Sequence, residues 1–91
     1  MAVGLIFQVT GVSLEQYQQV LDEACPDNQL PPGMLYHAAG PGPTGMCVID
    51  IWDSEESMQA FETEKLRHAR QRANITAHQV TIFPIINIMQ P

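Results

Sequence analysis

Apolar positions divide the chain into four segments rich in β-branched and aromatic residues and two segments with apolar residues at helical spacing. The four segments are predicted strands, over residues 3–10, 34–39, 46–52 and 79–89. The first helical segment follows Ser13, an N-cap residue with Gln16 three positions later, as in a capping box. The second follows Asp53 or Ser54, either of which can serve as the N-cap. The predicted order is therefore β-α-β-β-α-β.

Proline and glycine set the ends of these elements. Pro26 ends the first helix, and the second is expected to fray near Asn74. The glycine- and proline-rich stretch 40–45 is typical of a turn, so it joins the second and third strands as a hairpin. Right-handed crossovers then place the first and third strands in the centre of a four-stranded sheet. Pro84 cannot donate a ladder hydrogen bond, which suits an edge position for the last strand.

The third strand, residues 46–52, is apolar on both sides, although two helices can cover only one face of such a sheet. We expect the hairpin to pair residues whose numbers sum to 85. The uncovered face would then carry Ile6, Gln8, Leu35, His37, Val48, Asp50 and Trp52. An apolar face of this size predicts a homodimer in which a second copy covers it, with a partly polar cavity enclosed between the opposed sheets.

Composition narrows the class of protein. The 91 residues predict a single domain, 1–91, and the 45% apolar content is typical of a globular chain. The net charge is −6, and the only basic residues lie in the segment 65–72, which we interpret as a solvated helix face. This balance disfavours nucleic acid and anionic membranes as partners. No apolar run is long enough to span a membrane, and the N-terminus lacks the features of a signal peptide. Cys25 and Cys47 are expected to be free thiols, so we expect a cytoplasmic protein.

Two titratable residues stand out within the predicted hairpin. His37 is surrounded by apolar residues, and Asp50 lies across the hairpin within two strand positions of it. A histidine oriented by a carboxylate can act as a general base, so both are candidate catalytic residues. The alternative is a structural histidine that is simply satisfied by a carboxylate or backbone hydrogen bond.

Three further residues form the predicted substrate-binding set. Trp52 can stack on a flat substrate, although a core or interface aromatic is an equally good interpretation. Tyr36 can donate to a substrate oxygen or else pack under a helix. Gln8 lies on the same predicted face as His37 and completes the set.

The sequence contains no clear motif for metal binding, nucleophilic catalysis or phosphate binding. The three histidines have no ligand spacing, and Glu64 with His68 has no third ligand, so we predict neither a metal site nor a cofactor. There is no nucleophile motif of the Gly-x-Ser-x-Gly type. The glycines of the hairpin alternate with prolines, which is not a phosphate-binding pattern.

Two local patterns carry a resemblance to a known superfamily. They are the hairpin, with Gly33-Met-Leu-Tyr-His-Ala-Ala-Gly40 and then Gly45 to Asp53, and the segment from Trp52 to Phe61, of the form W-x-S-x-E-x-x-x-x-F. With the predicted layout they resemble the dimeric α/β-barrel superfamily, and specifically the antibiotic-biosynthesis-monooxygenase-like group. The resemblance implies a ferredoxin-like homodimer of cytoplasmic, usually bacterial origin. Its members include cofactor-independent oxygenases, haem-degrading enzymes and proteins of no known activity.

The resemblance also implies which types of side chain would hold a substrate or a haem. The oxygenases hold their substrate in an interior pocket with Trp, Asn, Tyr and Arg side chains. Trp52 matches such a residue, whereas no interior Asn or Arg can be matched by motif. An axial haem ligand on the second helix would have to be His68.

The predicted fold class is α+β, a ferredoxin-like βαββαβ domain that pairs into a dimeric α/β barrel. The predicted function is binding of a small aromatic or polyketide-like molecule in a pocket between sheet and helices of the homodimer. The enzyme would be monooxygenase-like, or a cyclase or isomerase, without a bound cofactor. The alternative is a non-catalytic dimeric module for ligand binding or assembly. A ligand-sized cavity with His37 and Asp50 in contact favours the enzyme. An interior filled by Met34, Met46, Phe83 and Met89 favours the module.

Overall fold

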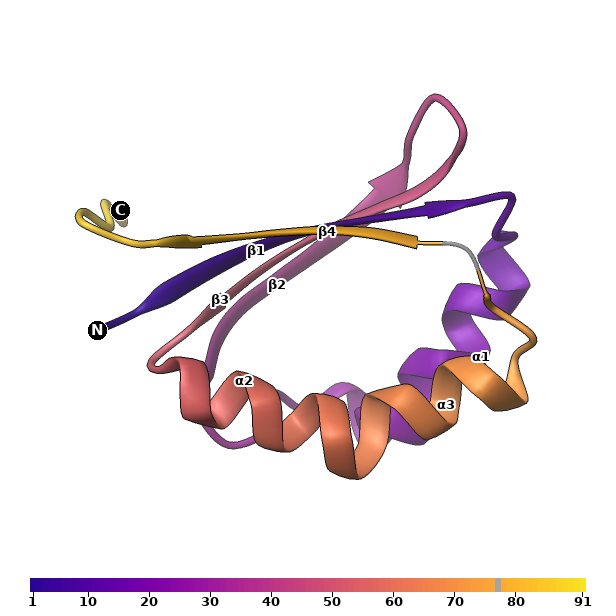
Figure 1. Ribbon diagram of the computed structural model, residues 1–91, viewed down its shortest axis with the longest axis horizontal. Helices are drawn as coiled ribbons and strands as arrows, with labels where there is room; N and C mark the ends of the chain where they lie inside the picture. The colour runs from indigo at the N-terminus through magenta and orange to yellow at the C-terminus, as the bar shows by residue number, and fades with distance from the viewer. Residues whose placement is uncertain (77) are drawn as a thin grey trace.

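The chain forms a four-stranded antiparallel sheet with helices on one face only (Figure 1). The computed structural model describes residues 1–76 and 78–91. In chain order the elements are β1 Val3–Thr10, α1 Leu14–Ala24, the short η1 Pro26–Asn28, β2 Met34–Pro41, β3 Gly45–Trp52, α2 Glu55–Phe61, the π-helical turn η2 Glu62–Leu66, α3 Arg67–Arg72 and β4 His78–Pro84. The βαββαβ order confirms the predicted ferredoxin-like fold class.

The strands lie in the order β2-β3-β1-β4, so β1 and β3 are central and β4 is at an edge, as predicted. The last strand is shorter than the predicted span 79–89 and ends at Pro84. Proline lacks the N–H that would continue the ladder. The N–H of Ile85 still donates to the carbonyl of Ala2, at 2.9 Å, and the chain then leaves the sheet.

The helices begin where their capping residues predict. Ser13 accepts from the N–H of Gln16 at 3.1 Å, and the Gln16 side chain accepts from the N–H of Ser13 at 3.0 Å. Ser54, rather than Asp53, caps the second helical segment and accepts from Ser57. This segment runs through α2, η2 and α3 without a break and stops at Ala73. None of the helices in residues 1–76 and 78–91 combines the length and apolar character that a membrane crossing requires.

The predicted hairpin register is wrong. His37 pairs with Asp50 and Ala38 with Ile49, so paired numbers sum to 87 rather than 85, and a bulge at Leu35 interrupts the ladder. Leu5 of β1 also pairs with Asp50, which places the even-numbered residues of β3 on the helix side. This shift of two residues keeps the same side chains together on each face of the hairpin. The predicted face was wrong for a separate reason: β3 is apolar on both faces, so its pattern does not show which of them is the inner one. His37, Asp50 and Trp52 therefore face the helices and not the uncovered side.

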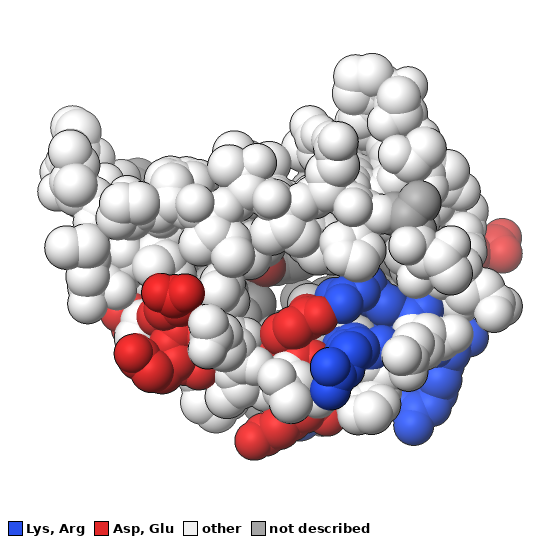
Figure 2. All heavy atoms as spheres, in the orientation of Figure 1, with Lys and Arg blue, Asp and Glu red and all other residues white. Residues whose placement is uncertain are grey.

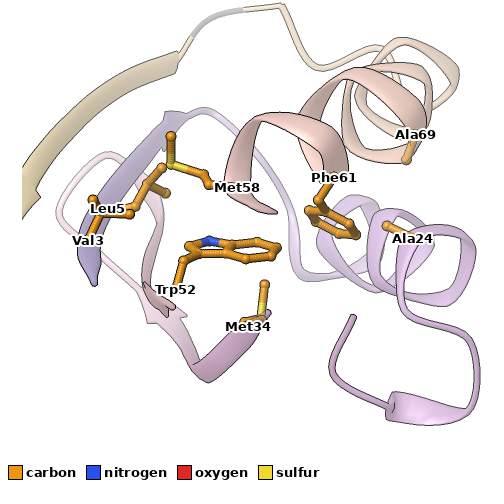
Figure 3. Close-up of a cluster of buried hydrophobic side chains, with 8 residues drawn as sticks. All are labelled: Val3, Leu5, Ala24, Met34, Trp52, Met58, Phe61 and Ala69. Atoms are coloured by element: carbon orange, nitrogen blue, oxygen red, sulfur yellow. The ribbon is translucent and has the colours of Figure 1, made fainter. Parts of the chain in front are cut away.

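The core lies between the sheet and the helices and is centred on Trp52, which is 1% exposed (Figure 3). Its ring packs against Phe61, with ring centroids 5.4 Å apart. The buried cluster consists of Val3, Leu5, Ala24, Met34, Trp52, Met58, Phe61 and Ala69. Trp52 is therefore the core aromatic that the alternative interpretation predicted, and it also borders a cavity described below.

The opposite side of the sheet has no helix over it (Figure 1). We call this surface the open face, and it carries Ile6, Gln8, Tyr36, Ala38, Cys47, Ile49, Ile51, Thr81 and Phe83. Ile49, on a central strand, is 45% exposed. Figure 2 shows charged side chains gathered on the helix layer, beside a sheet layer that is almost free of them. The open face is thus apolar and uncovered in a single copy of the chain.

Candidate functional site

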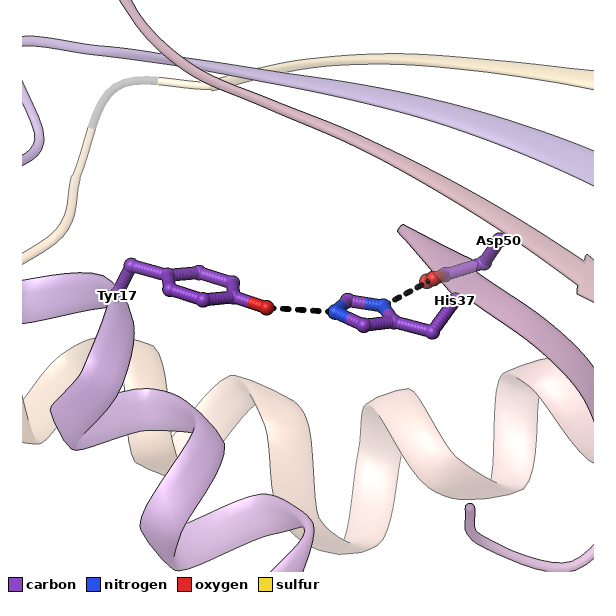
Figure 4. Close-up of polar contacts among 3 residues, drawn as sticks. All are labelled: Tyr17, His37 and Asp50. Carbon is purple, nitrogen blue, oxygen red and sulfur yellow. Dashed lines mark hydrogen bonds and ion pairs between the residues drawn. The ribbon is translucent and has the colours of Figure 1, made fainter. Parts of the chain in front are cut away.

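Three polar side chains from three elements meet in a line on the helix side of the sheet (Figure 4). Nδ1 of His37, on β2, lies 2.6 Å from a carboxylate oxygen of Asp50, on β3. Nε2 of His37 lies 2.7 Å from the hydroxyl of Tyr17, on α1. The tyrosine and histidine rings are nearly coplanar, with an interplanar angle of 2°. We call this trio the relay.

The fold explains why these groups meet. His37 and Asp50 are directly opposite across the hairpin, where side chains on one face are close neighbours. Asp50 is only 6% exposed, and a buried carboxylate is costly unless it is paired and hydrogen-bonded. His37 supplies that partner. The predicted contact between these two residues is therefore present, although on the other face of the sheet.

Tyr17 was not among the predicted site residues. Tyr17 lies on the side of α1 that faces the sheet, whereas the sequence analysis assigned His37 to the opposite face of the sheet. Burial raises the pKa of Tyr17, and the negative charge of Asp50 and the thiol of Cys25 raise it further. Its hydroxyl is therefore a weak acid that stays protonated at neutral pH.

Two neighbouring cavities lie between the sheet and the helices. The smaller, of about 80 Å³, is lined by apolar side chains such as Phe7 and Val48, and all three relay residues border it. The larger, of about 270 Å³, lies beneath β4 and is bordered by Trp52 and Met58. Asp50 borders both cavities and marks where they adjoin.

The larger cavity opens at the β4 edge. Val80 and Ile82 point to the helix side of the sheet, yet they remain 40% and 49% exposed because no helix covers them. The indole of Trp52 lies in the wall of this cavity, and its ring nitrogen is on the side of Met58 (Figure 3). This Nε1 is buried and has no hydrogen-bond partner among the described residues. A buried N–H without an acceptor is energetically costly.

Arg70 is an interior arginine, which the sequence interpretation missed. It is 8% exposed, borders the smaller cavity and lies over the ring of Phe7 at 5.4 Å from the centroid. Both of its terminal nitrogens donate to the carboxylate of Glu62 on η2. The hydrogen bond from Arg70 holds the pKa of Glu62 below its usual range, against the opposing effect of burial. The prediction of a solvated basic helix face is therefore wrong for Arg70, because its pairing with Glu62 permits burial.

The remaining predicted residues are not brought to this site. Tyr36 and Gln8 lie on the open face and border neither cavity. Tyr36 is exposed, so the alternative that placed it under a helix is also wrong for a single copy of the chain. His68 is exposed on α3. In the described part of the chain, no three His, Cys, Asp or Glu side chains come together in a way that would hold a metal ion.

Of the four residues expected to fill the interior of a non-catalytic module, two are buried and two are exposed. Met34 and Met46 are buried on the helix side and border the smaller cavity, as the module alternative expects. Phe83 and Met89 are exposed and fill nothing in a single copy. Both cysteines are free, as predicted.

Comparison with known proteins defines the class of fold. The sequence matches no family model and no curated protein. The structure is similar to a proposed antibiotic biosynthesis monooxygenase from Chloroflexus aurantiacus, with a TM-score of 0.63, 19% identity and 98% of each chain covered. It is also similar to SnoaB, a cofactor-independent oxygenase from Streptomyces nogalater, with a TM-score of 0.69, 7% identity, and 99% of this chain and 97% of SnoaB covered.

A third similar structure is a dimeric ferredoxin-like protein of unknown function from Thermobifida fusca. Its TM-score is 0.68 at 18% identity, and the match covers 93% of this chain and 92% of that one. The chain therefore shares the ferredoxin-like fold of these proteins, as the resemblance predicted. Function has to be argued from the site, because one fold hosts many activities.

Proposed function

We propose that this chain binds a small aromatic or polyketide-like molecule between its sheet and its helices and removes a proton from it with the His37–Asp50 pair. The observation that carries the proposal is the 2.6 Å contact between these two residues in the wall of an apolar cavity. A carboxylate that accepts from Nδ1 orients the imidazole and stabilises the imidazolium that forms when a proton arrives.

The larger cavity suits the body of the ligand. Its volume of about 270 Å³ is close to the lower end of known ligand pockets, roughly 300 Å³. The smaller cavity has only about 80 Å³, so it suits the reacting end of the ligand. In this placement Trp52 forms an apolar wall beside the body of the ligand, and Asp50 lies where the body and the reacting end join.

Removal of one proton is a useful step for such a ligand. An aromatic or polyketide-like molecule delocalises the resulting negative charge, and the anion can then react with oxygen, cyclise or isomerise. The proposed enzyme is accordingly monooxygenase-like, or a cyclase or isomerase, and the step requires no bound cofactor. The similarity to SnoaB, a cofactor-independent oxygenase, supports the first of these reactions.

The proposed working unit is a homodimer whose two open faces are opposed. Ile49 and Phe83 are exposed on that face, and an apolar patch of this kind is typical of an interface. The structural similarity to a dimeric ferredoxin-like protein supports the same arrangement. Tyr36 and Gln8 would then lie between the subunits, away from the relay.

A non-catalytic dimeric module is the second candidate. The observation that favours it is the presence of Met34 and Met46 in the interior, where they reduce the smaller cavity to about 80 Å³. Methionine side chains adapt readily, so they can either fill this space permanently or yield it to a ligand.

A crystal of the dimer soaked with 4-nitrophenol tests binding, and His37→Ala tests the chemistry. We expect density between sheet and helices, and we expect the variant to lose oxygen consumption with an aromatic polyketide substrate by about 10²- to 10⁴-fold while it stays dimeric. His68→Ala, which changes an exposed histidine outside the site, is the matched control. Loss of the dimer in His37→Ala would instead show a structural histidine, and full activity in it would refute the proposed base.

A further inference from the structure

Both ring nitrogens of His37 are already occupied. Nδ1 contacts Asp50 at 2.6 Å and Nε2 contacts the Tyr17 hydroxyl at 2.7 Å. A ligand in the cavity therefore cannot reach His37 unless it displaces Tyr17. Another member of the relay must therefore accept the hydrogen bond from the ligand.

The direction of the two hydrogen bonds identifies that group. An ionised carboxylate only accepts, so the Nδ1–H of His37 donates to Asp50. In a neutral imidazole the other nitrogen is then an acceptor, so the Tyr17 hydroxyl donates to Nε2. A hydroxyl that donates its single proton keeps two lone pairs, and the oxygen of Tyr17 thus remains an acceptor at the wall of the smaller cavity.

We propose that Tyr17 is the residue that touches the ligand, as the outer member of a Tyr17–His37–Asp50 proton relay, and that the ligand presents a phenol or enol hydroxyl to its oxygen. This inference rests on the function proposed above. It adds a catalytic residue and restricts the ligand to molecules with an acidic hydroxyl.

The step transfers two protons: one arrives at the Tyr17 oxygen and one leaves it. The ligand O–H bond breaks and its proton forms a new O–H bond at Tyr17, while the electron pair stays on the ligand as a phenolate or enolate. The original Tyr17 O–H bond breaks and that proton binds Nε2 of His37. The products are the ligand anion, a neutral tyrosine and an imidazolium beside the Asp50 carboxylate, with no change in oxidation state.

The surroundings of Tyr17 favour this concerted route over a free tyrosinate. Its ring is half-buried, lies edge to edge with that of His37 with centroids 6.1 Å apart, and carries a hydroxyl whose pKa is raised by burial and by Asp50. A separate negative charge on its oxygen is therefore disfavoured. When the proton moves on to His37 at the same time as another arrives, no such charge forms, and the new charge resides on the ligand and on His37.

The first measurement needs no ligand. Nitrogen NMR of the histidine side chains in the wild-type protein reports which ring nitrogen of neutral His37 carries the proton. We expect the proton on Nδ1 and an unprotonated Nε2. A proton on Nε2 would make His37 the donor to Tyr17 and would overturn the inference.

The second measurement uses 4-nitrophenol, whose phenolate has its own visible absorption band, and 4-nitroanisole, which has the same shape without the hydroxyl. We expect the wild-type protein to bind 4-nitrophenol in its ionised form and to prefer it to 4-nitroanisole. Tyr17→Phe keeps the ring and removes the oxygen, so it should lower the ionised fraction of bound 4-nitrophenol at least about tenfold and erase the preference. Tyr36→Phe, which removes a hydroxyl on the open face, is the matched control and should behave like the wild type.

The variants separate the two proposals. If Tyr17→Phe still ionises bound 4-nitrophenol, the inference is overturned, and the proposed function survives with His37 as the direct base. If His37→Gln also ionises it, the proposed function fails as well. If the wild-type protein binds 4-nitrophenol only in its neutral form or does not bind it, both proposals fail.

Discussion

The two faces of the sheet differ in how their side chains are covered. On the helix side, β3 places Asp50 and Trp52 into a core that covers them, and the buried carboxylate is satisfied by His37. On the open face, the alternate residues of the same strand, such as Ile49, are apolar and uncovered. Alternate residues of one strand therefore either line the interior cavities or form an uncovered apolar surface.

The difference shows where polarity is tolerated in this fold. The helix side accepts three polar groups because each of them satisfies another, so that no charge of the relay is buried without a partner. The open face offers no such network, and its apolar surface is best covered by an equivalent surface from a second copy. The proposed chemistry and the proposed assembly thus belong to opposite sides of the sheet.

The largest expected effect is on the helix side. Phe61→Ala removes a buried ring from its contact with Trp52, so the free energy of unfolding should fall by about 3–5 kcal/mol. Leu14→Ala changes an exposed side chain at the start of α1 and should alter stability by no more than about 0.5 kcal/mol. Chemical denaturation measures both variants. Equal losses would contradict the assignment of the core to this side.

A charge on the open face should act on assembly rather than on folding. In the proposed dimer, Ile49→Lys buries two unpaired charges, so the dissociation constant should rise by at least about a hundredfold. Gln71→Lys, on the exposed surface of α3, introduces the same charge and should leave the dimer intact. Size-exclusion chromatography with light scattering measures both variants. A wild-type protein that is a stable monomer at micromolar concentration would refute the homodimer.

The smallest expected effect concerns pH. Because Arg70 lowers the folded-state pKa of Glu62, the unfolded chain binds the proton more readily than the folded one. The stabilisation by Glu62 is therefore fully present above about pH 4.3, the ordinary glutamate value, and is lost as the pH falls through the depressed pKa. We expect the wild type to be more stable than Glu62→Gln at neutral pH, and the difference to shrink in acid.

The control for this comparison is Glu64→Gln on the same π-helical turn. Glu64 is exposed, and the ion pairs found in the described part of the chain do not include it. Denaturation curves across the acid range should show no comparable convergence for this variant. A pH-independent difference between the wild type and Glu62→Gln would mean that the ion pair contributes nothing through its charge.

The sequence by itself determined the elements and their order. Ser13 with Gln16, the turn at 40–45 and Pro84 are local features whose chemistry acts within a few residues, so their consequences could be predicted without the fold. The contact between His37 and Asp50 was also within reach, because a hairpin brings such positions together in several registers.

Only the tertiary structure decided which way each strand faces. The register of β3 depends on its partners and on the bulge at Leu35, and a strand that is apolar on both sides carries no local mark of its inner face. The meeting of Tyr17 with His37 and the burial of Arg70 depend on that orientation and on the packing of helices that are distant in sequence. Side-chain direction is a property of paired strands and packed layers, whereas capping and turn formation are properties of the local chain.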